Sequence, residues 1–250
     1  MRTIRFLDAV VPSARLTRVL SQIVGIEEER RLRARARALA AEAAAAGDES
    51  GWFERLYAEA EAGDAVVPWS DGAPNPHLTE WAARERLDGR GKRALVVGCG
   101  LGYDAEFLAR LRYTVTGFDV APTAIERVVR ENPGSPVSYV TADLLDLPAT
   151  WTGGFDLVVE VYTVQPLFGP VRERALAALA APVAPGGTLL VIARATNEEN
   201  PERDPAMMPW ALTRRELDLA GGPLRTVNVE QFMDDEDPPK LRWRAEFRRD

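Results

Sequence analysis

Three glycines at alternate positions, Gly98, Gly100 and Gly102, follow the apolar run Leu95–Val97 and precede a helical pattern that begins near Tyr103. This order predicts a buried parallel strand, a tight turn and a helix N-terminus. Glycine lets the backbone approach a ligand closely, and the start of a helix offers unpaired N–H groups to it. The loop is therefore a candidate cradle for a nucleotide-like cofactor.

The spacing of these glycines separates two classes of cofactor. A dinucleotide-binding fingerprint, G-x-G-x-x-G, would require glycine where Tyr103 stands, so an NAD-dependent oxidoreductase is the weaker alternative. Cys99 lies between the first two glycines. We interpret it as a small side chain that fits a tight turn beside the cofactor rather than as a reactive thiol.

Acidic residues follow the glycine loop and end the next two predicted strands. Asp119 could accept hydrogen bonds from the two hydroxyls of a ribose, with Val120 beside it; the alternative is a helix-capping acid. Asp143 could accept from an adenine amine, with Leu144 supplying an N–H and apolar cover, or it could be a plain loop acid. Asp104 could lie near a cationic group, although capping of its helix would explain it equally well.

A second set of candidates follows the fourth predicted strand, where a second reactant would meet the cofactor. Glu160 could bind an ammonium group of the cofactor or act as a base, and Tyr162 and Gln165 could orient a substrate. Arg194 could meet an anionic substrate, and Trp210 could belong to an apolar lid. The alternatives are packing for the two aromatic residues and a solvent-facing ion pair for the arginine.

His77 is the only histidine of the chain and Cys99 the only cysteine. The pKa of histidine suits proton transfer near neutrality, so His77 is a candidate catalytic residue, but its loop-to-helix position also suits a surface or capping role. One histidine and one cysteine are too few for an ordinary zinc site, and a single cysteine forms no internal disulfide. We expect neither a metal nor covalent thiol catalysis.

The length, hydrophobic content and net charge of the chain limit the classes of protein to which it can belong. At 250 residues and 46% hydrophobic content, the chain can build one full α/β domain. A net charge of -7 argues against a general nucleic-acid binder, although a local basic groove stays possible in principle. No apolar run approaches the roughly 18 residues of a membrane helix, and the N-terminus lacks an apolar signal region. We expect a cytoplasmic protein, monomeric or homodimeric, without nucleic-acid or membrane partners.

A regular alternation of strand and helix patterns begins at Arg93. Strands are predicted over 94–97, 114–119, 137–141, 155–160 and 188–193, and two further strand-like runs cover 224–231 and 241–248. Helices are predicted over 103–112, from 122, over 171–181, and from Thr213, where Glu216 completes a capping box. This pattern predicts an α/β, Rossmann-like, doubly wound seven-stranded sheet, mostly parallel with an antiparallel C-terminal strand.

The chain before the sheet divides into an extension and a cap. Residues 1–50 are predicted as an N-terminal helical extension, with a short helix over 13–24 and a long one over 26–46. The long helix is either a solvated surface helix or a lid or dimer contact. Residues 51–250 form the main domain, in which 51–91 are cap helices (51–63 and 76–87) with a loop and 92–250 the sheet core. Ligands of such sheets bind at the carboxyl ends of the strands, where the candidate residues should converge.

Two motifs, Val97–Ala105 and Thr116–Ile125, closely resemble those of class I S-adenosylmethionine (SAM)-dependent methyltransferases. The runs Phe155–Glu160 and Ala184–Leu190 are similar to later motifs of the same family. The chain looks most like the branch of thiopurine S-methyltransferases and bacterial thiol, halide and tellurite methyltransferases. The loop Pro68–Pro76 is similar to the N-terminal loop of that branch, although the segment after Glu160 lacks the aromatic-rich run of the thiopurine enzymes.

The resemblance implies methyl transfer from SAM to a small-molecule acceptor, with S-adenosylhomocysteine (SAH) as product and no metal. It places Trp69 against the cofactor, the three glycines at the methionine end, Asp119 at the ribose, and Asp143 with Leu144 at the adenine. Sulfur, oxygen, nitrogen or an inorganic nucleophile stay open as the acceptor atom. A non-catalytic SAM-binding regulator is the alternative function.

Overall fold

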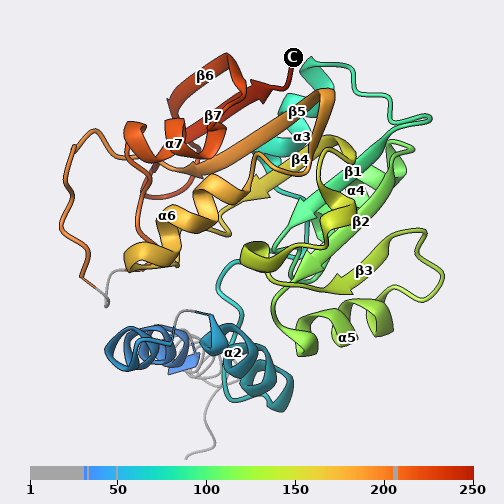
Figure 1. Ribbon diagram of the computed structural model, residues 1–250. Coiled ribbons are helices and arrows are strands. Elements are labelled where there is room, and N and C mark those ends of the chain that lie inside the picture. Colours follow the sequence, from blue (N-terminus) through green and yellow to red (C-terminus); the bar gives the residue numbers. More distant parts are fainter. Residues whose placement is uncertain (1–30, 33, 49, 205–207) are drawn as a thin grey trace, which may run out of the picture.

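The computed structural model describes residues 31–250 apart from 33, 49 and 205–207. Within these residues, seven strands form one sheet in the order β3-β2-β1-β4-β5-β7-β6 (Figure 1). They are β1 (Arg93–Val97), β2 (Thr114–Asp119), β3 (Ser138–Thr141), β4 (Phe155–Val161), β5 (Val183–Arg194), β6 (Arg225–Met233) and β7 (Leu241–Arg248). The first five strands are parallel, and β7 lies antiparallel between β5 and β6. The predicted doubly wound α/β sheet is confirmed.

The helices cover both faces of this sheet. They are α2 (Gly51–Ala62), α3 (Pro76–Arg84), α4 (Tyr103–Arg110), α5 (Pro122–Glu131), α6 (Gly169–Ala178) and α7 (Arg214–Gly221). Apolar side chains of α6 and α7 pack in one core layer, and those of α3 and α4 pack in the other. Residues 34–46 are also helical.

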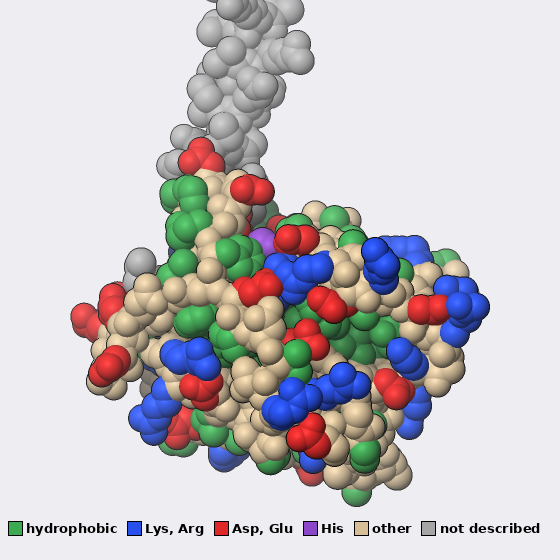
Figure 2. All heavy atoms as spheres, turned by 90° about the horizontal axis from the view of Figure 1, so that it is seen from above, with side chains coloured by type: hydrophobic (Ala, Val, Ile, Leu, Met, Phe, Trp, Pro, Cys, Tyr) green, Lys and Arg blue, Asp and Glu red, His purple; other side chains and the backbone are tan. Residues whose placement is uncertain are grey.

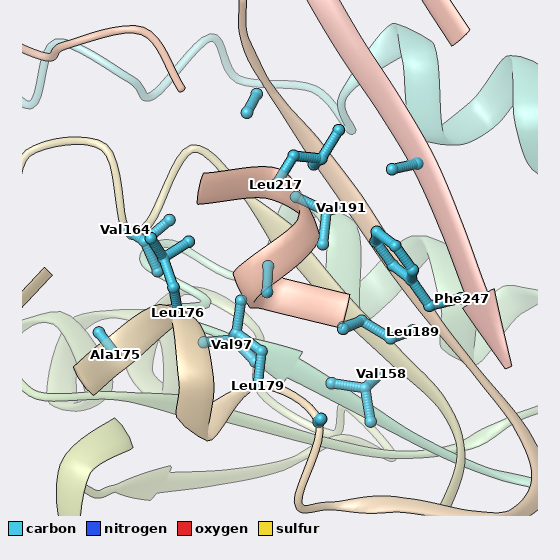
Figure 3. Packing of buried hydrophobic residues seen from close by; sticks show 14 of the residues in the cluster. Val97, Val158, Val164, Ala175, Leu176, Leu179, Leu189, Val191, Leu217 and Phe247 are labelled. Atoms are coloured by element: carbon cyan, nitrogen blue, oxygen red, sulfur yellow. The ribbon is translucent and has the colours of Figure 1, made fainter. Parts of the chain in front are cut away.

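Alternation along the strands explains the two layers. Leu95 and Val97 of β1 enter the layer under α6 and α7, whereas Ala94 and Val96 enter the opposite one, because successive side chains of a strand point to opposite faces. Figure 3 shows the first layer, in which Val158, Leu189, Val191 and Phe247 converge with Leu217 of α7. Apolar runs buried on both faces are typical of parallel sheets.

Several element boundaries differ from the predicted ones for local reasons. Helix α6 begins at Gly169 because Pro170 stands in its first turn, where its missing N–H costs nothing. Strand β5 begins at Val183 instead of the predicted 188, and its pairing with β4 contains a bulge between the pairs Phe155–Val183 and Leu157–Thr188. Helix α3 ends at Arg84, and β3 connects to β4 through two short 3-10 helices. The capping box at Thr213 is confirmed.

The N-terminal helices pack on each other and on the sheet domain. Leu39, Trp52 and Leu56 belong to a small core between helix 34–46 and α2. In α2, Glu54 accepts hydrogen bonds from the backbone N–H (3.0 Å) and hydroxyl (2.5 Å) of Thr123, at the start of α5. The short helix predicted over 13–24 and the start of the long one at 26 lie outside the described residues.

Charges of both signs are interspersed over the surface that Figure 2 shows, without a uniformly basic patch on that face. Among the described residues, no helix is both long and apolar enough to span a bilayer. In the same part of the chain, no cluster of three or more His, Cys, Asp or Glu side chains has the arrangement of a metal site.

Candidate functional site

The carboxyl ends of β1, β2 and β4 meet at one pocket, which we call the cofactor pocket. Part of its wall comes from α2 and from the loop between α2 and α3. Many of the candidate residues line it: Trp69, Gly98, Cys99, Gly100, Asp104, Asp119, Val120, Asp143, Leu144 and Tyr162. Neighbouring parallel strands bring Gly98, Asp119 and Tyr162 together although the chain separates them by up to 64 positions (98 to 162).

The three glycines of the loop adopt positive φ angles, of 56° at Gly98, 50° at Gly100 and 82° at Gly102. A Cβ at Gly98 would lie 2.3 Å from Thr163 Cγ2, and one at Gly100 would lie 2.9 Å from Tyr57 Oη. A Cβ at Gly102 would lie 2.4 Å from the hydroxyl oxygen of Tyr139. Gly102 does not line the pocket. A glycine is needed there because Tyr139 and Val128 leave no room for a side chain.

Asp119 is 7% exposed and ends β2 inside the pocket. Its Oδ2 accepts from the backbone N–H of Gly100 and its Oδ1 from that of Ala121, both at 3.0 Å. Burial raises the pKa of this carboxyl, and the backbone N–H donors oppose the shift. Each carboxylate oxygen keeps a further lone pair, so the group can still accept hydrogen bonds from a diol.

Tyr57 is a pocket residue that sequence reasoning missed. Its hydroxyl accepts a hydrogen bond from Trp69 Nε1 at 3.1 Å and closes the space above Gly100. Trp69 is 37% exposed, and its ring makes an edge contact with that of Tyr57. The tryptophan therefore lies over the glycine loop because a buried tyrosine of α2 holds it there. The only sequence signal for Tyr57 was its place on an aromatic helix.

Asp104 and Asp143 shape the pocket through backbone contacts. Asp104 Oδ1 accepts from the N–H of Asn75 at 2.7 Å and so fastens the loop before α3 to the start of α4; burial raises its pKa. Asp143 is exposed and accepts from the N–H of Leu145 at 2.8 Å. Cys99 packs against Gly117, and burial raises the pKa of its thiol well above the ordinary value, which keeps the sulfur protonated.

Glu160 and Gln165 hold the backbone of the loop after β4. The Oε1 atom of Glu160 accepts from the N–H groups of Thr163 (2.7 Å) and Val164 (3.1 Å). Gln165 donates to the carbonyl of Trp210 (2.9 Å) and accepts from the N–H of Arg194 (2.8 Å). Both side chains are fully buried and neither lines the pocket. In this structure both side chains hold backbone groups in place.

Tyr162 occupies the loop that Glu160 holds. It lines the pocket with a left-handed φ of 59°, a conformation that costs energy for a residue other than glycine and is frequent at functional sites. The guanidinium of Arg242, from β7, lies 5.0 Å from the centre of its ring. Burial raises the pKa of the hydroxyl, and the positive charge of Arg242 opposes that shift.

Arg172 of α6 donates hydrogen bonds to the loop after β4, and it was not a candidate from the sequence. Its side chain is 1% exposed, and it donates to the carbonyl oxygens of Gln165 (2.7 Å) and Ala211 (3.2 Å). Its Nε bonds Glu216 Oε1 at 2.6 Å, and Arg203 reaches the same oxygen. The residues that follow it, Glu173 and Arg174, are charged and lie in the same helix. The sequence therefore does not indicate that Arg172 is the buried one.

The remaining candidates lie outside the pocket. The ring of His77 packs edge-on against Phe232 at 5.0 Å, and burial lowers its pKa. Arg194 donates to the carbonyl of Pro209 at 3.0 Å. Trp210 is 7% exposed and donates from Nε1 to the carbonyl of Asp204 at 2.9 Å. Trp210 packs as its alternative expected, whereas Arg194 bonds a backbone carbonyl instead of the expected ion pair.

Comparison with known families agrees with this geometry. Residues 94–187 match the model of the methyltransferase domain family. This part of the chain is similar to a methyltransferase domain. The match begins in β1 and ends within β5, so it contains the glycine loop, Asp119 and the loop after β4.

Two curated relatives are methyltransferases of different kinds. One is a probable thiol methyltransferase of Arabidopsis thaliana, 31% identical over 160 residues, which cover 56% of this chain and 65% of the relative. The other is a ubiquinone biosynthesis O-methyltransferase of Xanthomonas axonopodis, 35% identical over 122 residues, which cover 48% of this chain and 49% of the relative. The chain thus spans 65% of the length of the first relative and 49% of the second.

Solved structures share the methyltransferase fold. The N-methyltransferase NodS of Bradyrhizobium japonicum, solved with SAH, aligns with a TM-score of 0.56 over 78% of this chain and 95% of that one. Its sequence identity to this chain is 23%, so the likeness concerns the fold.

Gly98→Ala tests the close approach of the glycine loop to Thr163. We expect the free energy of unfolding to fall by about 1–3 kcal/mol, because the new methyl group clashes with Thr163 and strains a left-handed residue. The measurement is urea unfolding. Gly153→Ala is the matched control, since Gly153 has a φ of 62° and open space around it. Equal losses in the two variants would contradict the clash.

Glu160 should make the stability of the protein depend on pH. Burial raises the pKa of its carboxyl from 4.5 to about 7. Between these values the folded protein binds the proton more tightly than the unfolded chain does, so stability should fall as the pH rises from 4.5 to 7 and should stay reduced above 7. The loss attributable to this group is about 3 kcal/mol.

Glu160→Gln should abolish this pH dependence, because the amide keeps an acceptor for Thr163 and has no charge to bury. Urea midpoints measured between pH 5 and pH 8 check it, and Glu173→Gln, on the exposed side of α6, is the control. A wild-type protein whose midpoint rises over that interval relative to the glutamine variant would refute the assignment.

Proposed function

We propose that the protein transfers a methyl group from SAM to a small-molecule acceptor. The observation that carries the proposal is the buried carboxylate of Asp119 beside the glycine loop, in a pocket that Asp71, Asp104 and Asp143 also line. Among the described residues that line it, no side chain is cationic. Carboxylates of this kind fit a nucleoside that carries a sulfonium and an ammonium group.

The roles of the chain's own residues follow from their places. Gly98 and Gly100 would admit the methionine part against the backbone, Asp119 would bind the ribose, and Asp143 with Leu144 would bind the adenine. Trp69 and Tyr57 would cover the glycine loop. When bound, SAM supplies an activated methyl group, which passes to a lone pair of the acceptor as its bond to sulfur breaks, and the proton of the acceptor is released to solvent. Positioning and exclusion of water are then the main tasks of the protein.

Tyr162 is the residue we place on the acceptor side, because it lines the pocket at the end of β4. The names of the two curated relatives support sulfur or oxygen as the acceptor atom, and the likeness to the thiol methyltransferase supports the thiol branch. We further propose that the enzyme works without a metal, in the cytoplasm, as a monomer or homodimer, and without nucleic-acid or membrane partners.

The decisive experiment combines binding and turnover with the full chain. Calorimetry should show binding of SAM and SAH and none of NAD. Incubation with SAM labelled in its methyl group and a panel of thiols, phenols and amines should transfer label to at least one acceptor. Binding of SAM without transfer to any member would favour a non-catalytic SAM-binding regulator, and failure to bind SAM would overturn the proposal.

A further inference from the structure

A second cavity, which we call the apolar groove, adjoins the cofactor pocket. Trp69 and Pro166 line both cavities, so the two lie side by side at these residues. Other walls of the groove are supplied by Ala36, Ala40, Trp52, Pro68 and Met208. Among its described lining residues, Arg37 is the one charged side chain, and it is exposed.

Trp52 brings to the wall of the groove a buried polar group that has no partner among the described residues. The side chain is 2% exposed, and its Nε1 is buried without a hydrogen bond in the described part of the chain. Four other tryptophans do donate from Nε1: Trp69 to Tyr57, Trp81 to Glu246, Trp210 to Asp204 and Trp243 to Leu212. A buried N–H that stays unpaired is costly, which points to a ligand that pairs it.

Aromatic rings separate the two cavities. Trp52 stacks on Phe53 with 4.2 Å between ring centres, and Phe53 lines the cofactor pocket. The ring of Trp69 lies edge-on to both, at 6.1 Å and 6.0 Å. A molecule that extends from the pocket past Trp69 would therefore enter an apolar space walled by Trp52.

We propose that the apolar groove holds the tail of the methyl acceptor and that the indole N–H of Trp52 donates a hydrogen bond to an oxygen in that tail. The acceptor class is an uncharged, mainly apolar molecule with a carbonyl, ether or hydroxyl oxygen some distance from the atom that is methylated. This inference rests on the proposed function, since the groove can hold the tail of an acceptor only if SAM binds in the adjoining cofactor pocket.

A homologous series of probes tests the apolar tail. The full chain is loaded with SAH, and the affinities of 4-alkylphenols, from methyl to octyl, are measured by calorimetry. Each added methylene should tighten binding about threefold to fourfold until the groove is filled. A flat series with SAH bound overturns the inference and leaves the proposed function standing. Failure of SAH itself to bind overturns both.

Trp52→Phe tests the hydrogen bond. The probes are the same phenols with one methylene of the tail replaced by an ether oxygen at successive positions. In the wild type, one position of the oxygen should bind about threefold to tenfold tighter than its neighbours, and this preference should vanish in Trp52→Phe. Trp81→Phe, outside both cavities, should keep the preference. A wild type without a preferred position, or a preference unchanged in Trp52→Phe, overturns the role of Trp52.

Discussion

Replacing Asp119 with alanine should weaken SAM binding by at least a hundredfold, or about 3 kcal/mol, while the protein stays folded. Two ribose hydroxyls would lose a charged acceptor that the fold holds in place through Gly100 and Ala121. Calorimetric titration of the purified variant with SAM measures the loss. Because the change leaves these two N–H groups next to a pocket open to water, we expect the folding cost to be smaller than the binding cost.

The matched control for this prediction is Asp156→Ala. Asp156 is an exposed carboxylate at the other end of the sheet, in β4, and it also accepts from a backbone N–H, that of Arg93 at 2.8 Å. SAM affinity should be unchanged in the control. If Asp119→Ala bound SAM as tightly as the control does, the ribose would have to be held elsewhere, and the proposed placement of the nucleoside would be wrong.

Replacing Arg172 with methionine should lower the free energy of unfolding by about 3–5 kcal/mol, the range for loss of one partner of a buried ion pair. The fully buried guanidinium bridges Glu216 and the carbonyl oxygens of two separate segments, at Gln165 and Ala211. Methionine fills much of the volume but removes these hydrogen bonds and the buried positive charge beside Glu216. Urea unfolding at neutral pH measures the change.

Arg174→Met is the control for the ion pair, because Arg174 stands on the exposed side of the same helix and its replacement should cost little. Arg172→Lys should recover only part of the loss, since an ammonium cannot span the carbonyl groups that the guanidinium reaches. Equal stability of Arg172→Met and Arg174→Met would show that the buried network contributes nothing net to the fold.

The fold was predictable because its local signals agree with one another. Alternation of apolar strands and capped helices predicted the order of the elements, and Thr114–Asp119 and Leu241–Arg248 have the predicted bounds. The pocket was predictable where residues end parallel strands, as with Asp119, because topology alone brings such ends together. Its glycines were recognisable from spacing.

The side chains after β4 could not be assigned from the sequence. Glu160 and Gln165 have polar side chains suited to substrates, but they turn inward to bond backbone groups, and no pattern in the chain distinguishes these two outcomes. Tyr57 and Arg172 were missed for a related reason, since their roles arise from contacts with residues 43 and 44 positions away (Gly100 and Glu216). Such contacts depend on tertiary packing rather than on local sequence.

The position of β7 between β5 and β6 has a consequence for folding during synthesis on the ribosome. Strand β6 is synthesised first, yet its only hydrogen-bonded neighbour among the described strands is β7. In a nascent chain that has emerged only as far as β6, the backbone hydrogen-bonding groups of β6 and those at the free edge of β5 are unpaired. Both edges could then pair with strands of other chains. The sheet can close only after the residues of β7 have left the exit tunnel.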